Sequence, residues 1–126
     1  DIDFDDVGYC IDGDYDWLLD AFSNVISNSA EHADKVYIGV ETSREKCVIT
    51  IKDNGGGFEK ENIDKIFDRF ESGNGAKTFH MGIGLNLAKL VIEAHYGKIS
   101  AYNDYEAGGA VFKIVLPQYQ LKKGKI

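Results

Sequence analysis

The sequence is poor in the residues that mark linkers, disulfide frameworks and membrane spans. It has one proline and two cysteines among 126 residues. Cys10 and Cys47 have neither the spacing of a zinc site nor a secretory context, so both are expected to be reduced thiols. No apolar run approaches the ~18 residues of a membrane span, and the opening DIDFDD is unlike a signal peptide. We therefore expect a cytoplasmic chain without a low-complexity linker.

Positive charge is also scarce, because 14 lysines and arginines stand against 21 acidic residues, for a net charge of -7. This balance argues against bulk attraction to nucleic acid, so an anionic ligand must be held by local geometry. The apolar fraction of 44% and the aromatic fraction of 12% predict a folded globule. We expect a single domain over residues 1–126, with 121–126 as a frayed tail, cut from a longer protein.

The central pattern is a predicted helix over residues 16–33 that has two different faces. Its apolar positions recur at three- and four-residue steps, and they are Leu18, Leu19, Phe22, Val25, Ile26 and Ala30. A polar row recurs at four-residue steps beside them, and it consists of Asp20, Asn24, Asn28 and His32. Asparagine is a mediocre helix former. The two asparagines therefore indicate either a solvated helix edge or a binding site, and the row alone leaves both open.

The remaining segments alternate between strand-like and helix-like periods. β-branched and aromatic runs predict strands at residues 2–12, 36–40, 48–51, 98–103 and 110–116. Helical periods predict a short helix from Lys60 and a long helix that Gly82 opens and Gly97 closes, with residues 71–81 as a mobile loop between them. Hairpins separated by helices favour an α+β fold, a two-layer α/β sandwich. Its sheet is expected to be mixed but mostly antiparallel, with helices on one face.

One candidate site begins at Asp53, which ends a predicted strand just before Gly55 and Gly57. A carboxylate there can accept a hydrogen bond from an exocyclic amine such as the 6-amino group of adenine, and it would repel a guanine carbonyl. The glycines let the backbone approach a ligand that a side chain would block. The alternative is a plain Asx-type turn, which Asp, Asn and Gly all suit.

A second candidate site begins at Gly82-Ile83-Gly84, ahead of the second long helix. Free N–H groups and the positive end of a helix dipole favour phosphate at such a place. No GK[ST] follows, so the segment is not a Walker loop. Arg69 stands just before the predicted loop and Lys77 lies within it, and both could reach a phosphate. An ordinary surface arginine and a solvated lysine are the alternatives.

Asn28 and the histidines complete the set of candidates. The amide oxygen of Asn28 is a hard, neutral ligand that suits Mg²⁺ already coordinated by phosphate oxygens. His32 lies one turn beyond and could place its ring against a base. His95, near the end of the second long helix, suits packing or the helix dipole, and His80 is assigned no role.

Taken together in this order, the segments resemble the catalytic ATP-binding (HATPase) domain of bacterial sensor histidine kinases. That group is a branch of the Bergerat-fold ATPases, with gyrase B, the Hsp90-type chaperones and the mismatch-repair ATPases. The matching motifs are the N box (Asn24–Ala30), the first glycine box (Asp53–Phe58), the F box (Ile66–Phe70) and the second glycine box (Gly82–Leu87). The resemblance covers residues 9–117, and four boxes in order with compatible spacing make it specific.

The resemblance implies roles for particular residues. Asn28 would hold Mg²⁺ and Arg69 would reach the terminal phosphate, which makes them the implied catalytic residues. Asp53 would accept the adenine amine. The residues implied to line the site of ATP are Asn24, Asn28, His32, Asp53, Gly55, Gly57, Ile66, Lys77, Gly82, Gly84 and Leu85.

The resemblance also implies an activity and partners. The domain would bind Mg-ATP and donate the γ-phosphoryl group to a histidine on a separate dimerisation and phosphoacceptor domain of the same parent protein. A response regulator would act downstream, and nucleic acid would not be a partner. The isolated domain is expected to be a monomer and the parent a homodimer. The parent is expected to be membrane-anchored, with this domain on the cytoplasmic side.

Three other functions share these boxes and stay open. The first is an ATP-hydrolysing Bergerat-fold ATPase. Members of that kind resemble one another in having a glutamate one helical turn before the metal-binding asparagine. This chain has Asn24 at that position, and an asparagine cannot act as a base. A serine kinase of the anti-sigma type is the second. A non-catalytic pseudokinase is the third, because Glu31 stands where the family commonly has a phosphate-contacting lysine. His80-Met81 and Asn86 also replace small residues of the second glycine box.

Overall fold

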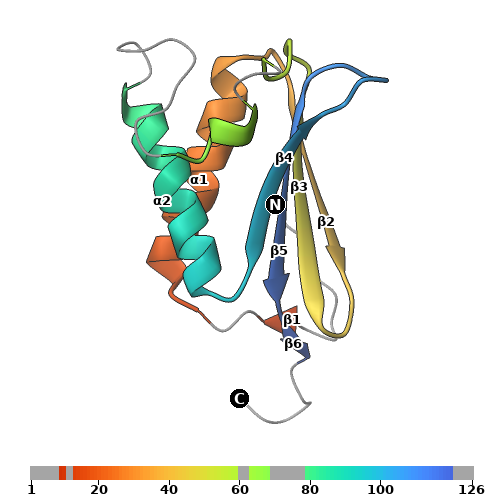
Figure 1. Cartoon of the computed structure of the whole chain (residues 1–126). Helices are drawn as coiled ribbons and strands as arrows, with labels where there is room; N and C mark the ends of the chain where they lie inside the picture. Colours follow the sequence, from red (N-terminus) through yellow and green to blue (C-terminus); the bar gives the residue numbers. More distant parts are fainter. Residues whose placement is uncertain (1–8, 11–12, 60–62, 69–78, 121–126) are drawn as a thin grey trace.

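The structure is a computed structural model of the chain, and it describes residues 9–10, 13–59, 63–68 and 79–120. Two helices, α1 (Tyr15–Glu31) and α2 (Phe79–Ala94), lie on one face of a four-stranded sheet (Figure 1). The sheet has the order β2-β3-β5-β4 and is wholly antiparallel. Its strands are β2 (Val36–Thr42), β3 (Lys46–Asp53), β4 (Lys98–Asn103) and β5 (Ala110–Pro117). The predicted two-layer α+β sandwich is confirmed.

Short elements complete the described chain. β1 (Tyr9–Cys10) pairs with β6 (Tyr119–Gln120) in a separate two-stranded ladder, and η1 (Ile63–Lys65) is a single 3-10 turn. Of the strand predicted over 2–12, only Tyr9 and Cys10 are described as strand. The predicted helix start at Lys60 and the frayed tail 121–126 lie outside the described residues. Within the residues described here, no helix is long and apolar enough to span a membrane.

The core lies between the sheet and the two helices. β5 contributes three side chains that are fully buried, Phe112, Ile114 and Leu116. They alternate with Lys113, which is exposed, and Val115, which is half-buried, as expected for a strand covered on one face. The apolar stripe of α1 and its counterpart in α2 cover these side chains. Cys47 is free and buried, and burial raises the pKa of its thiol.

His95 joins the end of α2 to the start of α1. Its Nδ1 lies 2.7 Å from the carbonyl oxygen of Val91, and its Nε2 accepts the backbone N–H of Asp14 at 2.9 Å. Asp14 is the N-cap of α1, and its carboxylate accepts the N–H of Trp17 at 3.1 Å. A Cβ on Gly13 would lie 2.3 Å from the His95 ring, which explains the glycine. The packing role predicted for His95 is therefore confirmed.

The two ends of α2 differ from the sequence-based prediction. The helix begins at Phe79, not at Gly82, because the three preceding residues continue it without a break. At the other end, Tyr96 and not Gly97 takes the left-handed conformation, with a φ angle of 65°. The N–H of Tyr96 bonds the carbonyl of Glu93 at 3.0 Å and that of Gly97 bonds Ile92 at 2.9 Å, which is the Schellman pattern. Gly97 is needed for space, since its Cβ would lie 2.5 Å from the Val115 oxygen.

We expect Tyr96→Gly to stabilise the fold by about 1 kcal/mol, because glycine adopts a positive φ without the steric cost of a Cβ. The Tyr96 side chain is 89% exposed, so little packing is lost. Tyr105→Gly is the matched control, since Tyr105 is 82% exposed and has no positive φ. It should be neutral or destabilising. Urea unfolding measures both, and equal changes in the two variants would contradict this account of the helix end.

Candidate functional site

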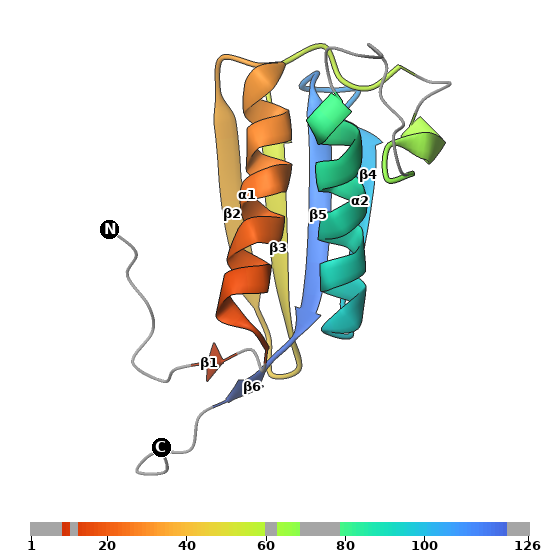
Figure 2. The ribbon, with the colours of Figure 1, turned by 90° about the vertical axis from the view of Figure 1, so that its left-hand side faces the viewer.

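The predicted site residues that the structure describes gather at one end of the sandwich. The C-terminal end of α1, the start of α2, the segment after β3 and the β4–β5 turn all lie at the top of the molecule in Figures 1 and 2. The β2–β3 hairpin and the β1–β6 ladder lie at the opposite end. Segments that are far apart in the sequence therefore meet at one end of the fold.

Asp53 is the central acidic group of this end. It is only 5% exposed. Its Oδ1 accepts the N–H of Gly55 at 2.9 Å and the N–H of Ala110 at 3.2 Å. Both bonds end on the same oxygen, and the described residues provide no hydrogen bond to Oδ2. The carboxylate is therefore held in place by one oxygen while the other can accept a donor from a ligand.

The glycines around Asp53 are required by the protein itself. A Cβ on Gly55 would lie 2.3 Å from the carbonyl oxygen of His32, at the end of α1. A Cβ on Gly109, which has φ 91, would lie 1.9 Å from the carbonyl oxygen of Asp53. By contrast, a Cβ on Gly56 would meet no atom within 4 Å. The sequence predicted that Gly55 leaves room for a ligand. The structure adds that the missing side chain of Gly55 also leaves room for the backbone at the end of α1.

Asn103, at the end of β4, was missed by the sequence analysis. Its Oδ1 accepts the N–H of Phe58 at 2.7 Å and its Nδ2 donates to the Phe58 carbonyl at 3.0 Å. A Cβ on Gly57, which has φ 82, would lie 2.7 Å from the same Oδ1. The ring of Phe58 then packs edge-on against Phe112, 5.4 Å between centroids. No local pattern could reveal this clamp, because its partners are 45 residues apart.

The β4–β5 turn beside the site is held by Asp104. Its carboxylate accepts the backbone N–H groups of Glu106 at 3.1 Å and Ala107 at 3.0 Å, and it forms an ion pair with Lys52 at 2.9 Å. These contacts, the Ala107 N–H first, hold the pKa of Asp104 below its usual value. The turn places Gly109 against the Asp53 carbonyl and places the N–H of Ala110 within hydrogen-bond distance of the Asp53 carboxylate.

The polar row of α1 borders the same end. Asn28 is 8% exposed and Asn24 is half-buried, and the structure gives neither side chain a hydrogen bond within the described part of the chain. The hydroxyl of Ser29 is also buried without a partner among the described residues. Unpaired buried polar atoms are costly. The amides of Asn24 and Asn28, which are not fully buried, are therefore the groups of this stretch that a polar ligand or water could reach.

The second glycine box faces the N box across the helix pair. A Cβ on Gly84 would lie 3.3 Å from Cγ of Asn24, so the glycine lets α2 approach α1. Gly84 lies beyond the first turn of α2, which begins at Phe79. In α1 the N–H of the fourth residue, Leu18, already bonds the carbonyl of the N-cap Asp14, and Gly82 is the fourth residue of α2. The free N–H groups at the start of α2 therefore belong to residues before Gly82, and a free N–H from Gly82 or Gly84 would need a different helix start. Asn86 in α2 donates from Nδ2 to the Phe67 carbonyl at 3.0 Å.

The other predicted site residues are divided between the core, the surface and the part of the chain outside the described residues. Leu85 is 5% exposed and belongs to the core, while Ile66 is half-buried against it. The His32 residue caps the end of α1 and is exposed. The two cationic candidates, Arg69 and Lys77, lie outside the described residues, as does most of the predicted loop over 71–81. Residues 79–81 of that loop are the first turn of α2.

A magnesium ion fits this donor set only together with a ligand. Within the described ranges, no three His, Cys, Asp or Glu side chains are grouped to hold a metal ion. Asn28 offers one neutral amide oxygen, and Mg²⁺ readily takes its remaining oxygens from phosphate and water. The residues present therefore fit an ion that arrives with a polyphosphate.

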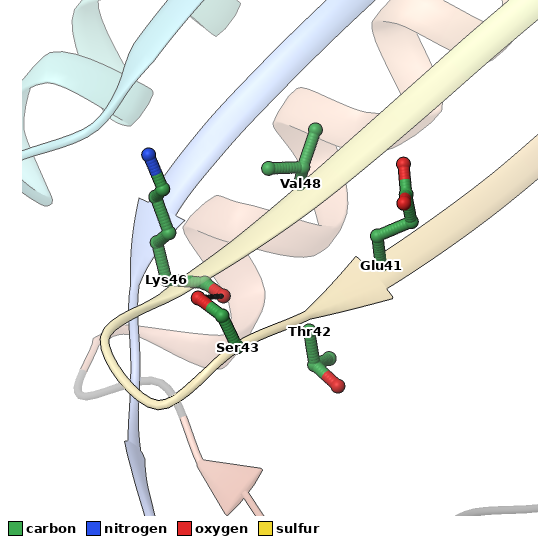
Figure 3. A pocket seen from close by; sticks show the side chains of 5 residues that line it. All are labelled: Glu41, Thr42, Ser43, Lys46 and Val48. Carbon is green, nitrogen blue, oxygen red and sulfur yellow. Dashed lines mark hydrogen bonds between the residues drawn. The ribbon is translucent and has the colours of Figure 1, made fainter.

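A separate surface hollow lies at the β2–β3 hairpin (Figure 3), and it is lined by Glu41, Thr42, Ser43, Lys46 and Val48. It is at the far end of β3 from Asp53, because Thr42 pairs with Cys47 and Val36 pairs with Asp53. The Ser43 hydroxyl donates to the Lys46 carbonyl at 3.3 Å and closes the turn. The hollow is therefore not part of the candidate site.

Comparison with known proteins shows which class of domain has this fold. The profile of the histidine kinase-, DNA gyrase B- and HSP90-like ATPases matches residues 13–120, and the chain belongs to that family. Within the family it is a catalytic domain of the sensor histidine kinase type. The predicted resemblance is therefore confirmed.

The relatives are sensor kinases. WalK of Staphylococcus saprophyticus is 36% identical over an alignment of 119 residues, and the match covers 88% of this chain and 19% of that protein. For one WalK of Staphylococcus aureus the identity is also 36%, over 28% of its length. The chain thus spans 19% and 28% of the lengths of these two curated relatives.

Solved structures share the fold. The mycobacterial sensor histidine kinase MprB superposes with a TM-score of 0.77 at 24% identity, over 90% of this chain and 80% of that one. The catalytic domain of the histidine kinase ThkA superposes with a TM-score of 0.72 at 27% identity, over 83% and 68%. At 24% identity, the likeness to MprB shows a shared fold alone.

We expect Gly55→Ala to destabilise the domain by about 1–3 kcal/mol, the usual cost of overpacking, because the new Cβ meets the His32 carbonyl. Gly56→Ala is the control and should stay within about 0.5 kcal/mol, since its Cβ meets open space. Thermal unfolding and ATP titration are measured on both. A Gly55→Ala variant of unchanged stability that has lost only ATP affinity would show that the glycine serves the ligand alone.

Proposed function

We propose that this domain binds Mg-ATP and donates the γ-phosphoryl group to a histidine on a separate dimerisation and phosphoacceptor domain of its parent protein. Membership in the histidine kinase-like ATPase family and 36% identity to WalK support this proposal. The parent would be a membrane-anchored homodimer that passes the phosphoryl group to a response regulator. The domain would lie on its cytoplasmic side.

The observation that carries the proposal is the geometry of Asp53. One carboxylate oxygen is saturated by two backbone donors, and the other is left to accept. An exocyclic amine of adenine would donate to that second oxygen, whereas a guanine carbonyl would be repelled by it. The buried position strengthens this discrimination, because a mismatched polar pair is costly away from water.

The phosphates would lie toward the helix pair. Asn28 would contribute its amide oxygen to the ion, which neutralises the charge that develops on the transferred group. Arg69 and Lys77 would contact the terminal phosphates, and Gly82 and Gly84, which have no side chains, would let the start of α2 lie close along them. Phosphoryl transfer depends mainly on positioning and charge stabilisation, so these contacts suffice once an acceptor imidazole is in line.

Hydrolysis is less well supported than transfer. Asn24 faces Gly84 at the junction of α1 and α2, and its amide cannot take a proton from water. His95 is a poor phosphoacceptor in the proposal, since both nitrogens of its ring are engaged at the opposite end of the fold. His32 would lie beside the nucleotide and not in line with its terminal phosphate. The nucleophile is therefore assigned to another domain.

Asp53→Asn should weaken the binding of ATP by about 1–3 kcal/mol, the cost of losing a charge-assisted hydrogen bond in a buried site. The fold should persist, because an amide oxygen can still accept the N–H groups of Gly55 and Ala110. Asp104→Asn is the control, since it removes a carboxylate from the neighbouring turn without touching Asp53. Calorimetric titration compares ATP with GTP. Equal losses for the two nucleotides would mean that Asp53 acts through the turn and not through the base.

Transfer is tested with γ-labelled ATP and magnesium, with the domain alone and with a histidine-bearing helical hairpin of the parent added in trans. We expect acid-labile label on the hairpin only. Asn28→Ala should abolish it, and Ser27→Ala, the exposed neighbour in α1, should not. Rapid phosphate release by the domain alone would favour a hydrolase. Acid-stable label on a partner would favour a serine kinase, and ATP binding without transfer a pseudokinase.

A further inference from the structure

The side chain of Asn54 connects two segments of the candidate site that are distant in the sequence. Asn54 lies in the turn that follows β3, directly after Asp53. Its Oδ1 accepts two consecutive backbone N–H groups, from Asp34 at 3.0 Å and from Lys35 at 2.9 Å. Its own backbone N–H donates to the Lys35 carbonyl at 3.2 Å. One residue of the first glycine box therefore holds the loop that leads from α1 to β2, at the top of the molecule in Figure 2.

The chemistry of this contact requires an oxygen at Asn54. Both groups that face the amide are backbone N–H donors, so the atom between them must be the acceptor of the amide and not its nitrogen. Aspartate offers an oxygen at the same distance from the backbone, whereas alanine offers none. The contact can therefore be removed or retained by substitution.

The end of α1 has few stop signals of its own. Its last turn contains no basic residue and does contain Glu31, the unfavourable charge for the negative end of the helix dipole. Ala33 follows the C-cap, where helices commonly have a glycine in the left-handed conformation. Among the described residues, the hydrogen bonds from residues 33–35 to other segments all go to Asn54. The path of the chain as it leaves α1 is therefore set from the glycine box.

The next residue, Gly55, brings the same two segments together by close packing. A Cβ on Gly55 would lie 2.3 Å from the His32 carbonyl oxygen, so the end of α1 lies directly against the turn. Gly55 also donates its N–H to Asp53 at 2.9 Å. Asn28 is one helical turn before His32 on α1. The turn after β3 thus carries Asp53 and also supports the helix end that carries Asn28.

We propose that Asn54 is a positioning residue that keeps this end of α1, with Asn28, at a fixed position relative to Asp53. The inference rests on the proposed function, in which Asp53 receives the adenine and Asn28 the ion of Mg-ATP. A ligand that contacts both residues binds more tightly when their separation is already correct, because it does not have to order its site. Asn54 acts through these two residues and not through a ligand contact of Oδ1, which already accepts two donors.

Nucleotide titration followed by NMR tests the positioning. Asn54→Ala should weaken Mg-ATP about 10-fold, the equivalent of one lost hydrogen bond. The affinity for AMP should stay unchanged, because AMP uses Asp53 but brings no polyphosphate to carry an ion to Asn28. Asn54→Asp should keep the affinity for Mg-ATP near that of the wild type, because its carboxylate accepts the same two N–H groups.

Ser43→Ala is the matched control for these titrations. The Ser43 hydroxyl donates to the Lys46 carbonyl at 3.3 Å in the exposed turn at the other end of β2 and β3. Its loss should leave both affinities unchanged. Equal losses of Mg-ATP and AMP affinity in Asn54→Ala, or no loss of either, would overturn the positioning role and leave the proposed function standing. A wild-type domain that binds Mg-ATP no better than AMP would overturn the proposed function, and this inference with it.

Hydrogen exchange reads the contact itself without nucleotide. The amides of Asp34 and Lys35 should exchange about 10-fold faster in Asn54→Ala than in the wild type, because their acceptor is gone. Asn54→Asp should restore their protection. Circular dichroism checks that both variants are folded. Unchanged exchange of these two amides in Asn54→Ala would show that another group holds the loop, and would refute the role of Asn54.

Discussion

The carboxylate of Asp53 is the contact on which the candidate site depends. Its Oδ1 holds the turn that follows β3, through Gly55, and the start of β5, through Ala110. A buried carboxylate needs such donors, since an unpaired charge away from water is far more costly than a neutral polar group. The same two donors leave Oδ2 available. The structural role of Asp53 and its proposed role in adenine recognition therefore use different oxygens of one group.

The glycines around this carboxylate show how closely the surrounding backbones approach. Gly55 lies against the end of α1 and Gly109 against Asp53 itself, so neither could carry a side chain even without a ligand. Asn103 then fixes the exit of the turn by bonding both backbone groups of Phe58. The rigidity of the site comes from backbone contacts between elements that are distant in sequence. Such contacts keep the described part of the site preorganised.

The two helices cover the sheet unequally, and this explains the exposed edge of the sheet at β2. α1 lies over β3 and the near side of β2, while α2 lies over β4 and packs along α1. Small residues at the junction, such as Gly84 beside Asn24, let the helices approach each other. Helices so close together cannot also reach the outer edge of β2. Ile38 and Val40 consequently remain exposed although they are on the core-facing side of the sheet.

The sequence alone determined the elements and their order, because periods of two and of 3.6 residues are local properties of the chain. The polar row of α1, the turn after Asp53 and the final hairpin were all recognisable from spacing. The helix ends were not, since α2 begins at Phe79, three residues before Gly82, and Tyr96 rather than Gly97 takes the positive φ. Only the tertiary structure decided that Asn103 clamps Phe58, that Gly55 makes room for the His32 carbonyl, and that β2 is left at an edge. These are contacts between distant segments, and no local pattern of residues encodes them.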